Sequence, residues 1–447
     1  MEEINITDSF LLYKDSSTEG KKPYFSKYDI IKDLNLDIIF RTMSRGDVLV
    51  SENINKIMML PLKTPEEIIY RQEIINDFYQ NQDLLEEIYG CVLKQQKALA
   101  EYKEETNKNR SRQMGKASQI IETLNYLGSG QDGLLFICQL LEKYNGKLES
   151  EGLQGLYTRL CCLPLKEIKE KLEDMDFFIS GGETGYTFQF GGGLKIDNAT
   201  VNYCRTKQRI QKKQKQGGFK KLYNKYVKKN SVQINNNEEL QKDIEYLEEF
   251  TLWHILKIFQ PYLSEIMLFY SHFTEEIAFY VGVINFMKRM EELYITLVMP
   301  EPQQTGTKDT EFKNLYELSM AVYMQKKPVG NDISLKDNKL VIVTGANQGG
   351  KSTFLRSYGI AQVLMQCGMP VPAERFSAPV YSQVFTHFTR REDEQLNSGR
   401  LQAELERMAK MVSAAKPHSL FLLNESFCQY NGERRVTNIW RNTSCIL

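Results

Sequence analysis

Residues Leu340–Thr353 read LVIVTGANQGGKST and are the clearest indication of how the C-terminal part of the chain folds. Leu340–Thr344 is a β-branched, apolar run that predicts a buried parallel strand. The residues that follow, Gly345–Ser352, fit the pattern G-x-x-x-x-G-K-[ST] in full, and apolar residues then recur at helical spacing. A strand, a glycine-rich loop and a helix in this order predict a phosphate-binding loop.

The residue types in this loop suit the binding of phosphate groups. Gly345 and Gly350 allow a tight turn that brings amide N–H groups toward phosphate oxygens, and the helix adds its positive end. Lys351 supplies a charge for the β- and γ-phosphates, and the Ser352 hydroxyl suits Mg²⁺. The candidate binding residues are Gly345, Ala346, Asn347, Gln348, Gly349, Gly350, Lys351, Ser352 and Thr353. A chance glycine-rich turn is the alternative interpretation.

A second strand of the same site is predicted at Ser419–Glu425, which reads SLFLLNE. Such a strand normally ends in Asp-Glu, where the Asp holds the Mg²⁺ shell and the Glu orients the attacking water. Here Asn424 replaces the Asp, so it can hydrogen-bond a Mg²⁺-bound water but brings no charge. Glu425 and Lys351 are the candidate catalytic residues, and Ser352 and Asn424 are the candidate metal residues. A solvated acid at a strand end is the alternative interpretation of Glu425.

Upstream of the loop, residues 28–170 are predicted to be almost wholly helical. Thr64 can cap a helix, Pro65 suits its first position and Glu67 completes a capping box. A second helix is expected from about Leu84 to Lys103, and the polar stretch 103–116 is expected to be an exposed helix or a loop. Helices should resume over 238–298, with Pro261 as a kink, and the polar segment 300–310 is expected to be a linker.

Between residues 177 and 203 the apolar period changes to two. Tyr186, Phe188 and Phe190 alternate with small or polar residues, and Gly191-Gly192-Gly193 suits a turn. This pattern predicts a small β-hairpin inserted between helices. The three aromatic rings are expected to form the hydrophobic face of that hairpin rather than a stacking platform for bases.

The charge pattern allows a nucleic-acid partner only through a local patch. The chain has 57 Lys plus Arg and 57 Asp plus Glu, so its net charge is zero. Residues 205–229 nevertheless carry eleven cations and no acid, with Phe219, Tyr223 and Tyr226 among them. This pattern is typical of nucleic-acid binding, and a solvated helix face is the alternative. The candidate contact residues are Lys212, Lys213, Lys215, Lys220 and Lys221.

Several other classes of protein are not expected. The eight cysteines are scattered without a CxxC pair, which favours free thiols in a reducing cytosol. The four histidines lie at no zinc-ligand spacing to a cysteine. The longest apolar-rich run, 277–287, is shorter than the roughly 20 residues that span a bilayer. The acidic N-terminus does not look like a secretory signal, so a cytoplasmic protein without a membrane partner is expected.

The segment Val343–Met408 resembles the ATPase domain of the MutS DNA mismatch repair family. The loop Gly345–Thr353, the segment Gly368–Ala373 (GMPVPA) and Ser398-Gly399-Arg400 match that family in order and spacing. Met43-Ser44-Arg45-Gly46 and Tyr70-Arg71-Gln72 more weakly resemble the start of its helical core.

The resemblance implies a mainly helical lever and clamp region with a small β insertion, followed by an α/β P-loop ATPase domain of the ABC type. It implies ATP at Gly345–Thr353, largely sequence-independent binding to DNA, and a homodimer in which Ser398–Arg400 reach the partner subunit's nucleotide. The expected domains are an N-terminal extension (1–30), the helical core (31–300, clamp insertion 177–238), a linker (301–312) and the ATPase domain (313–447).

Three departures from the family pattern limit these expectations. The helical core starts near residue 30, which leaves no room for a mismatch-reading domain, so direct mismatch reading is not expected. Leu401-Gln402 follow Ser398–Arg400 in place of Ser-Thr, and the ATPase domain is expected to be truncated after its second nucleotide strand. The hypotheses are therefore an ATP-driven DNA clamp, a non-catalytic nucleotide-binding or DNA-associating remnant, and another class of P-loop ATPase.

Overall fold

The computed structural model describes residues 11–14, 22–112, 116–179, 184–190, 196–204, 238–337, 340–346, 349–388 and 397–424. They fall into two compact units. The helical unit comprises the described residues within Gly90–Lys143 and Tyr157–Phe273, and the mixed unit comprises those within Asp8–Tyr89, Tyr144–Leu156 and Thr274–Leu447. The second of these contains the predicted phosphate loop.

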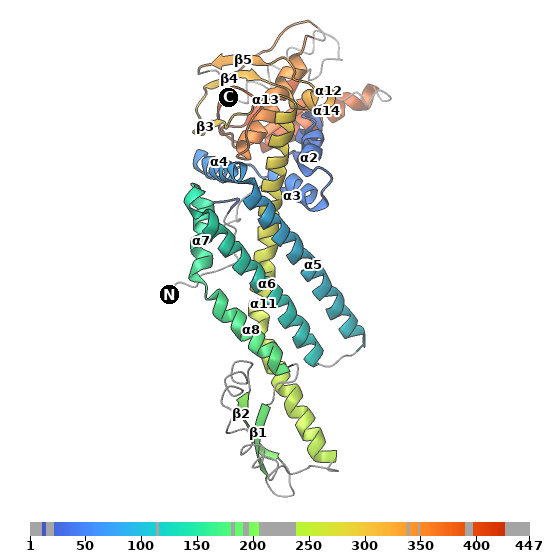
Figure 1. The fold of residues 1–447 in the computed structure, drawn as a ribbon. Helices are drawn as coiled ribbons and strands as arrows, with labels where there is room; N and C mark the ends of the chain where they lie inside the picture. The colour runs from blue at the N-terminus through green and yellow to red at the C-terminus, as the bar shows by residue number, and fades with distance from the viewer. Residues whose placement is uncertain are drawn as a thin grey trace. The chain divides into compact units, whose positions relative to one another are not determined.

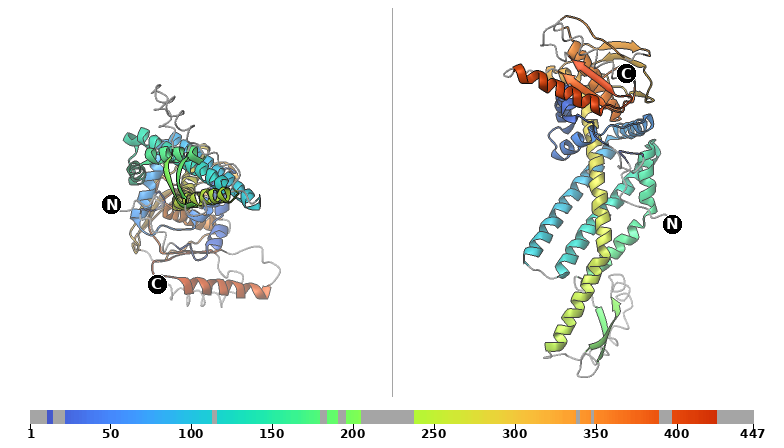
Figure 2. Two further views of the ribbon diagram at one scale, coloured as in Figure 1. Left: turned by 90° about the horizontal axis from the view of Figure 1, so that it is seen from below. Right: turned by 180° about the vertical axis from the view of Figure 1, so that it is seen from behind.

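The helical unit is built from long helices packed along their lengths. It contains most of α5 (Gln82–Arg112) and α6 (Lys116–Tyr144), the end of α7 (Glu151–Cys162), α8 (Leu165–Ile179) and the first part of α11 (Glu238–Glu292). Within this unit α5, α6 and α11 lie side by side (Figures 1 and 2). Gly130 permits close packing there, since a Cβ on it would lie 2.7 Å from Ile266 Cγ2. The Tyr270 hydroxyl then donates to the Gly130 carbonyl at 2.7 Å.

The predicted hairpin is present in the same unit. Strand β1 (Thr184–Phe190) pairs antiparallel with β2 (Ile196–Cys204), with Phe188 opposite Ala199. The predicted turn Gly191–Gly193 lies outside the described residues. So does the basic stretch 205–229, with the candidate contact residues Lys212, Lys213, Lys215, Lys220 and Lys221.

The predicted helical region upstream of the loop is confirmed. The mixed unit contains α1 (Lys27–Asp33), α2 (Leu36–Ser44), α3 (Val48–Met58), α4 (Pro65–Gln80) and the short 3₁₀ helix η1 (Asn145–Lys147). The Glu67 amide donates to Thr64 Oγ1 at 3.2 Å, so Thr64 caps α4. The Glu67 carboxylate accepts from the Lys63 amide at 2.9 Å, one residue before the expected partner. The stretch after Lys103 is also helical, because α5 runs on to Arg112.

The region around residues 290–310 differs from expectation. Helix α11 runs through Pro261 and ends at Glu292 rather than near 298. Within the expected linker, Glu301–Gln303 form strand β3, which pairs parallel with β6 (Arg375–Pro379). The side chains of β3 are exposed or half-buried, so this edge strand has no apolar alternation by which the sequence could reveal it.

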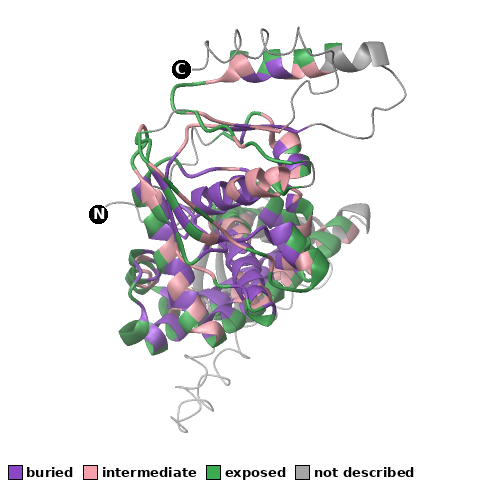
Figure 3. Ribbon diagram, turned by 90° about the horizontal axis from the view of Figure 1, so that it is seen from above, coloured by how far each residue is buried: buried purple, intermediate pink, exposed green. Residues whose placement is uncertain are grey.

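Two small sheets organise the mixed unit. The first has the order β3-β6-β4-β5 and contains β4 (Thr310–Leu315) and β5 (Asn331–Leu335), joined through α12 (Leu318–Met324). The second is the parallel pair β7 (Val384–Phe388) and β8 (Leu420–Asn424), joined through α14 (Asn397–Ala414). Helix α13 (Lys351–Gln366) packs by its aromatic residues on the first sheet, where the Phe312 ring stacks with those of Tyr358 and Phe376 at 6.0 Å. The second half of α13 is almost entirely buried (Figure 3).

A buried arginine fixes the C-terminal end of α13. Arg71 of α4 is fully buried, and its Nη1 donates to the Cys367 carbonyl at 3.0 Å. Its Nη2 and Nε donate to the Leu12 carbonyl at 2.6 and 3.2 Å. The amides of Leu11 and Leu12 donate to the Glu276 carboxylate of α11, at 3.0 and 3.2 Å. The segment Leu11–Leu12 thus connects α4 with α11, and Arg71 connects α4 with the residue that follows α13.

None of the helices in the described ranges has the length and apolar character needed to cross a membrane.

Candidate nucleotide-binding site

The predicted phosphate loop forms a tight turn at the start of α13. Gly350 caps the helix with φ 84°, a conformation that glycine adopts without strain. The Gly349 amide donates to the Ala346 carbonyl at 3.0 Å, and a Cβ on Gly349 would lie 2.9 Å from that same oxygen. Both glycines are therefore required by the backbone. Asn347 and Gln348 of the loop lie outside the described residues.

The Lys351 side chain folds back over the loop. Its ammonium donates to the carbonyls of Gly345 and Ala346, at 2.9 Å each. The Phe354 amide donates to the Gly350 carbonyl at 2.8 Å and makes the first hydrogen bond of the helix. The amides of the three residues before Phe354 have no acceptor within the helix, as at any helix N-terminus. The ammonium and the positive helix end thus meet at one half-exposed surface, which suits an anion.

The two candidate metal residues are in direct contact. The Ser352 hydroxyl donates to Asn424 Oδ1 at 2.8 Å. Strand β8 can approach α13 this closely because residue 359 is a glycine, where a Cβ would lie 2.7 Å from side-chain atoms of both Leu422 and Leu34. The packing of β8 against α13 therefore brings together two residues that are 72 positions apart.

These two residues fit a magnesium ion that a bound nucleotide also coordinates. Both offer oxygen donors, which Mg²⁺ prefers, and Mg²⁺ usually combines one or two protein ligands with phosphate and water. No group of three or more His, Cys, Asp or Glu side chains able to hold a metal occurs among the described residues. The donor set thus suits a phosphate-bound ion better than a cage made of protein alone.

The predicted strand before the loop is wrong. Residues 340–346 form no strand, and Leu340, Val341 and Ile342 are 61%, 46% and 70% exposed. A buried parallel strand needs hydrogen-bonded neighbours. Among the described strands β8 pairs only with β7, so the apolar run has no such neighbour.

The second predicted strand is confirmed as β8, with Phe388 of β7 opposite Asn424. His387 of β7 is 1% exposed, and burial, followed by the nearby charge of Arg407, lowers its pKa to about 4. The imidazole is therefore neutral near pH 7. The candidate catalytic residue Glu425 lies outside the described residues.

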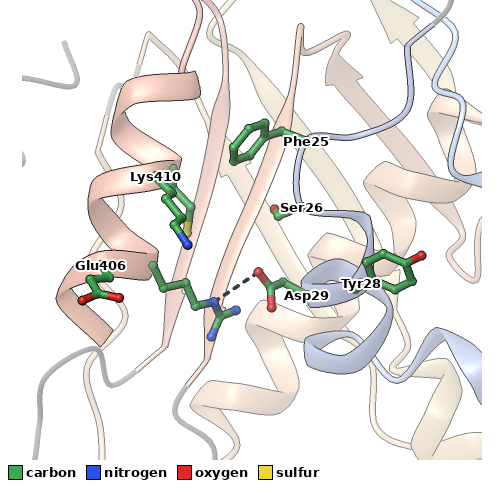
Figure 4. Close-up of a pocket in the computed structure, with 8 residues that line it drawn as sticks. Phe25, Ser26, Tyr28, Asp29, Glu406 and Lys410 are labelled. Atoms are coloured by element: carbon green, nitrogen blue, oxygen red, sulfur yellow. Dashed lines mark ion pairs between the residues drawn. The ribbon is translucent and has the colours of Figure 1, made fainter. Parts of the chain in front are cut away.

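An ion pair that the sequence did not indicate fixes β7. Arg407 Nη2 lies 2.6 Å from Asp33 Oδ2 and donates to the Thr386 carbonyl at 2.9 Å. Arg407 Nε also lies 3.3 Å from Asp29 Oδ2, as the dashed line in Figure 4 marks. The hollow in that view lies between the start of α1 and α14, and its lining includes no residue of the phosphate loop. Arg407 therefore supports the strand next to the site rather than the loop itself.

The predicted loop at Ser398-Gly399-Arg400 is helical instead. The three residues fall in the first turn of α14, which begins at Asn397. The polar sequence Asn397-Ser398 suits a helix start, and the apolar spacing that follows continues the helix without a break.

Comparison with known protein families identifies the family to which this site belongs. The model of the MutS2 N-terminal domain matches residues 63–293, which is more than half of the chain, and the model of MutS domain V matches residues 341–427. The chain belongs to the MutS family. The resemblance stated from the sequence is confirmed, and residues 341–427 are part of a MutS ATPase domain, which implies the binding of ATP.

Individual relatives are similar over part of their length. The DNA mismatch repair protein MutS of Prochlorococcus marinus (strain MIT 9301) is 39% identical over 101 residues, which is 22% of this chain and 11% of that protein. MutS protein homolog 4 of Mus musculus is 26% identical over 206 residues, 46% of this chain and 21% of that protein. The MutS of Methanosarcina mazei is 25% identical over 235 residues, 46% of this chain and 26% of that protein. The chain thus matches about a quarter or less of each of these relatives.

Proposed function

We propose that this MutS-family chain binds ATP with Mg²⁺ at Gly345–Thr353 and couples the state of the nucleotide to its grip on DNA. The proposed binding of Mg²⁺-ATP is supported chiefly by the contact between Ser352 Oγ and Asn424 Oδ1, at 2.8 Å, beside the ammonium of Lys351. A phosphate cradle, a cation and two oxygen donors at one helix end are the parts that a nucleoside triphosphate site needs.

In this mechanism each residue has a distinct task. The amides at the start of α13 and the Lys351 ammonium bind phosphate oxygens and neutralise their charge. Ser352 and Asn424 would hold Mg²⁺ through their oxygen atoms, and the ion would supply positive charge to offset the charge that develops on the phosphates. Glu425, the next residue after Asn424, would orient the attacking water. Ser352 and Asn424 carry no charge, so the metal depends more on the phosphates than it would beside an aspartate.

A second candidate function is binding of the nucleotide without hydrolysis. The neutral Asn424 favours it, because it stands where a carboxylate would normally hold the ion during turnover. Two measurements separate the candidates: calorimetric binding of Mg²⁺-ATP, and steady-state release of phosphate. Lys351→Ala should abolish binding, whereas Glu425→Gln should keep binding and abolish turnover. A wild-type chain that binds but releases no phosphate above background supports the second candidate, and a folded chain that does not bind refutes both.

The DNA part of the proposal rests on the basic stretch 205–229. Affinity for duplex DNA should fall steeply with salt and vary little with sequence, because lysines neutralise phosphates. The triple reversal Lys212→Glu, Lys213→Glu and Lys215→Glu should weaken binding at least tenfold. A matched reversal of Lys94, Lys97 and Lys103, which are exposed on α5, should have a much smaller effect. Equal losses from the two sets would contradict the assignment.

Coupling between the two ligands needs its own measurement. The dissociation constant for DNA should change several-fold on addition of Mg²⁺-ATP in the wild type, and should not change in Lys351→Ala. An unchanged constant in a wild type that binds both ligands would refute coupling while leaving both sites in place. We also propose that the chain acts as a homodimer, which sedimentation with and without nucleotide would test.

A further inference from the structure

Two cysteines that are far apart in the sequence meet in the helical unit. Cys138 of α6 and Cys161 of α7 are separated by 23 positions, and their sulfur atoms lie 3.7 Å apart. Cys138 is half-buried and Cys161 is exposed, so reagents in solution can reach the pair. A disulfide needs a sulfur–sulfur distance of about 2.05 Å, so the two sulfurs must approach by roughly 1.7 Å. Closing this gap requires rotation of one or both cysteine side chains.

The surroundings give the two thiols different reactivities. Burial, the hydrogen bond with Cys161 and the charge of Glu142 raise the pKa of the Cys138 thiol to about 11, against a small opposing effect of Lys166. Cys138 is therefore protonated near neutral pH and is a poor first nucleophile. The Tyr157 hydroxyl hydrogen-bonds to Cys161, and this bond is the main cause that raises the pKa of Tyr157 to about 12. Cys161 is exposed whereas Cys138 is half-buried, so a dissolved oxidant reaches the Cys161 sulfur first.

We propose that Cys138 and Cys161 form a reversible disulfide that joins α6 to the end of α7, with a low-molecular-weight disulfide such as oxidised glutathione as the oxidant. Cys161 is the attacking thiol and Cys138 is the resolving thiol. The inference does not depend on the proposed function, because Cys138, Cys161 and Tyr157 lie in the helical unit and none of them belongs to the phosphate loop.

The chemistry balances in two exchange steps. The Cys161 thiolate attacks one sulfur of oxidised glutathione, forms a mixed disulfide and releases one glutathione thiolate. Cys138 then loses its proton to solvent and attacks the Cys161 sulfur, which breaks the mixed disulfide and releases the second glutathione. The protein loses two electrons and one molecule of oxidised glutathione gains them. The second step is intramolecular, so the short distance offsets the low thiolate fraction of Cys138.

The neighbouring Cys162 is a natural control. It is also exposed and follows Cys161 directly in α7, so it offers a reagent the same solvent access. Since successive residues of a helix point about 100° apart, Cys161 and Cys162 cannot both face Cys138. Replacing Cys162 by Ser should therefore leave the cross-link intact.

The experiment equilibrates the full chain in glutathione buffers of increasing oxidised fraction, traps free thiols by alkylation and maps the peptides by mass spectrometry. The wild type and Cys162→Ser should yield a peptide pair linked through Cys138 and Cys161, which dithiothreitol should reverse. Cys138→Ser should stop at a glutathione adduct on Cys161, and Cys161→Ser should give neither product at these positions. Circular dichroism should show that every variant keeps its helical content.

A further variant tests the assigned order of attack. Tyr157→Phe keeps the ring and removes the hydroxyl that hydrogen-bonds to Cys161, so the rate of the first step should change several-fold while the final linkage stays the same. The proposal is overturned if the wild type accumulates the Cys161 adduct without resolving it, if the linkage forms through Cys162, or if Cys138→Ser and Cys161→Ser give adducts at equal rates.

Discussion

The substitution Arg71→Met probes how the C-terminal end of α13 is held. Arg71 is fully buried and makes three hydrogen bonds, two with the Leu12 carbonyl and one with the Cys367 carbonyl. Its guanidinium also lies 5.2 Å from the ring centres of Tyr13 and Phe279. Methionine keeps most of the apolar stem but can donate to neither carbonyl. The variant therefore removes the donors and leaves both acceptors buried.

The expected loss follows from these contacts. A buried acceptor left without a donor costs about 1–3 kcal/mol, and two acceptors are affected. Removing one member of a buried, charged network typically costs about 3–5 kcal/mol, and part of this is recovered because methionine needs no desolvation. We expect Arg71→Met to lower the free energy of unfolding of the mixed unit by about 3–5 kcal/mol. Arg71→Lys keeps the charge but loses the planar guanidinium, so it should lower the free energy of unfolding by about 2 kcal/mol.

Urea unfolding followed by circular dichroism, together with native-state hydrogen exchange of the α13 amides, measures this loss. The matched control is Arg45→Met in the same unit. Arg45 is exposed and lies 3.5 Å from Glu292, so it should contribute less than about 1 kcal/mol. If Arg71→Met costs no more than Arg45→Met, the end of α13 is not held by this side chain and the reasoning fails.

Three further predictions concern the same unit. Burial lowers the pKa of His387 to about 4, so as the pH falls this imidazole is protonated in the unfolded chain before it is protonated in the folded chain. The free energy of unfolding should therefore fall by up to about 3 kcal/mol between pH 6.5 and pH 4. His387→Gln should flatten this pH profile in urea titrations. Gly359→Val should cost roughly 2–3 kcal/mol by overpacking, whereas Gly128→Val in α6, where no atom lies within 4 Å of the added Cβ, should cost far less in thermal unfolding. Thr64→Ala should cost about 1 kcal/mol through loss of the α4 cap, and an unchanged midpoint would contradict the capping assignment.

Local signals in the sequence predicted those parts of the fold that local interactions determine. The cap of α4 at Thr64 and the alternation of Tyr186, Phe188 and Phe190 depend on near neighbours, and the structure contains both elements. Strand β3 was missed because an exposed edge strand needs only a pairing partner, here β6, which lies more than 70 positions away. The run Leu340–Thr344 shows the opposite case, in which high strand propensity does not produce a strand without a neighbour to pair with.

The residues of the candidate site also fall into two groups, those that a local sequence pattern predicts and those that only tertiary packing brings together. The spacing of Gly350 and Lys351 is a local pattern, and it gave the turn and the cation correctly. The contact of Ser352 with Asn424 could be expected only through knowledge of how such strands and loops assemble. No spacing rule indicated that Arg407 would pair with Asp33, or that Cys138 would meet Cys161, because these contacts depend on how helices pack. Tertiary packing, which the sequence pattern does not encode locally, determined them.

Helix α13 combines the local motif of the phosphate loop with contacts that depend on tertiary packing. Its first turn holds the phosphate loop and contacts Asn424, and its C-terminal end is held by residues within the segment 58–71. The Gln366 carbonyl accepts from the Leu62 amide at 2.8 Å, and the Cys367 thiol donates to the Met58 carbonyl at 3.2 Å. A helix of this length is stiff, so a displacement at one end moves the other. The position of the loop relative to β8 therefore depends on contacts about 300 residues earlier in the sequence, which a search for the loop motif does not consider.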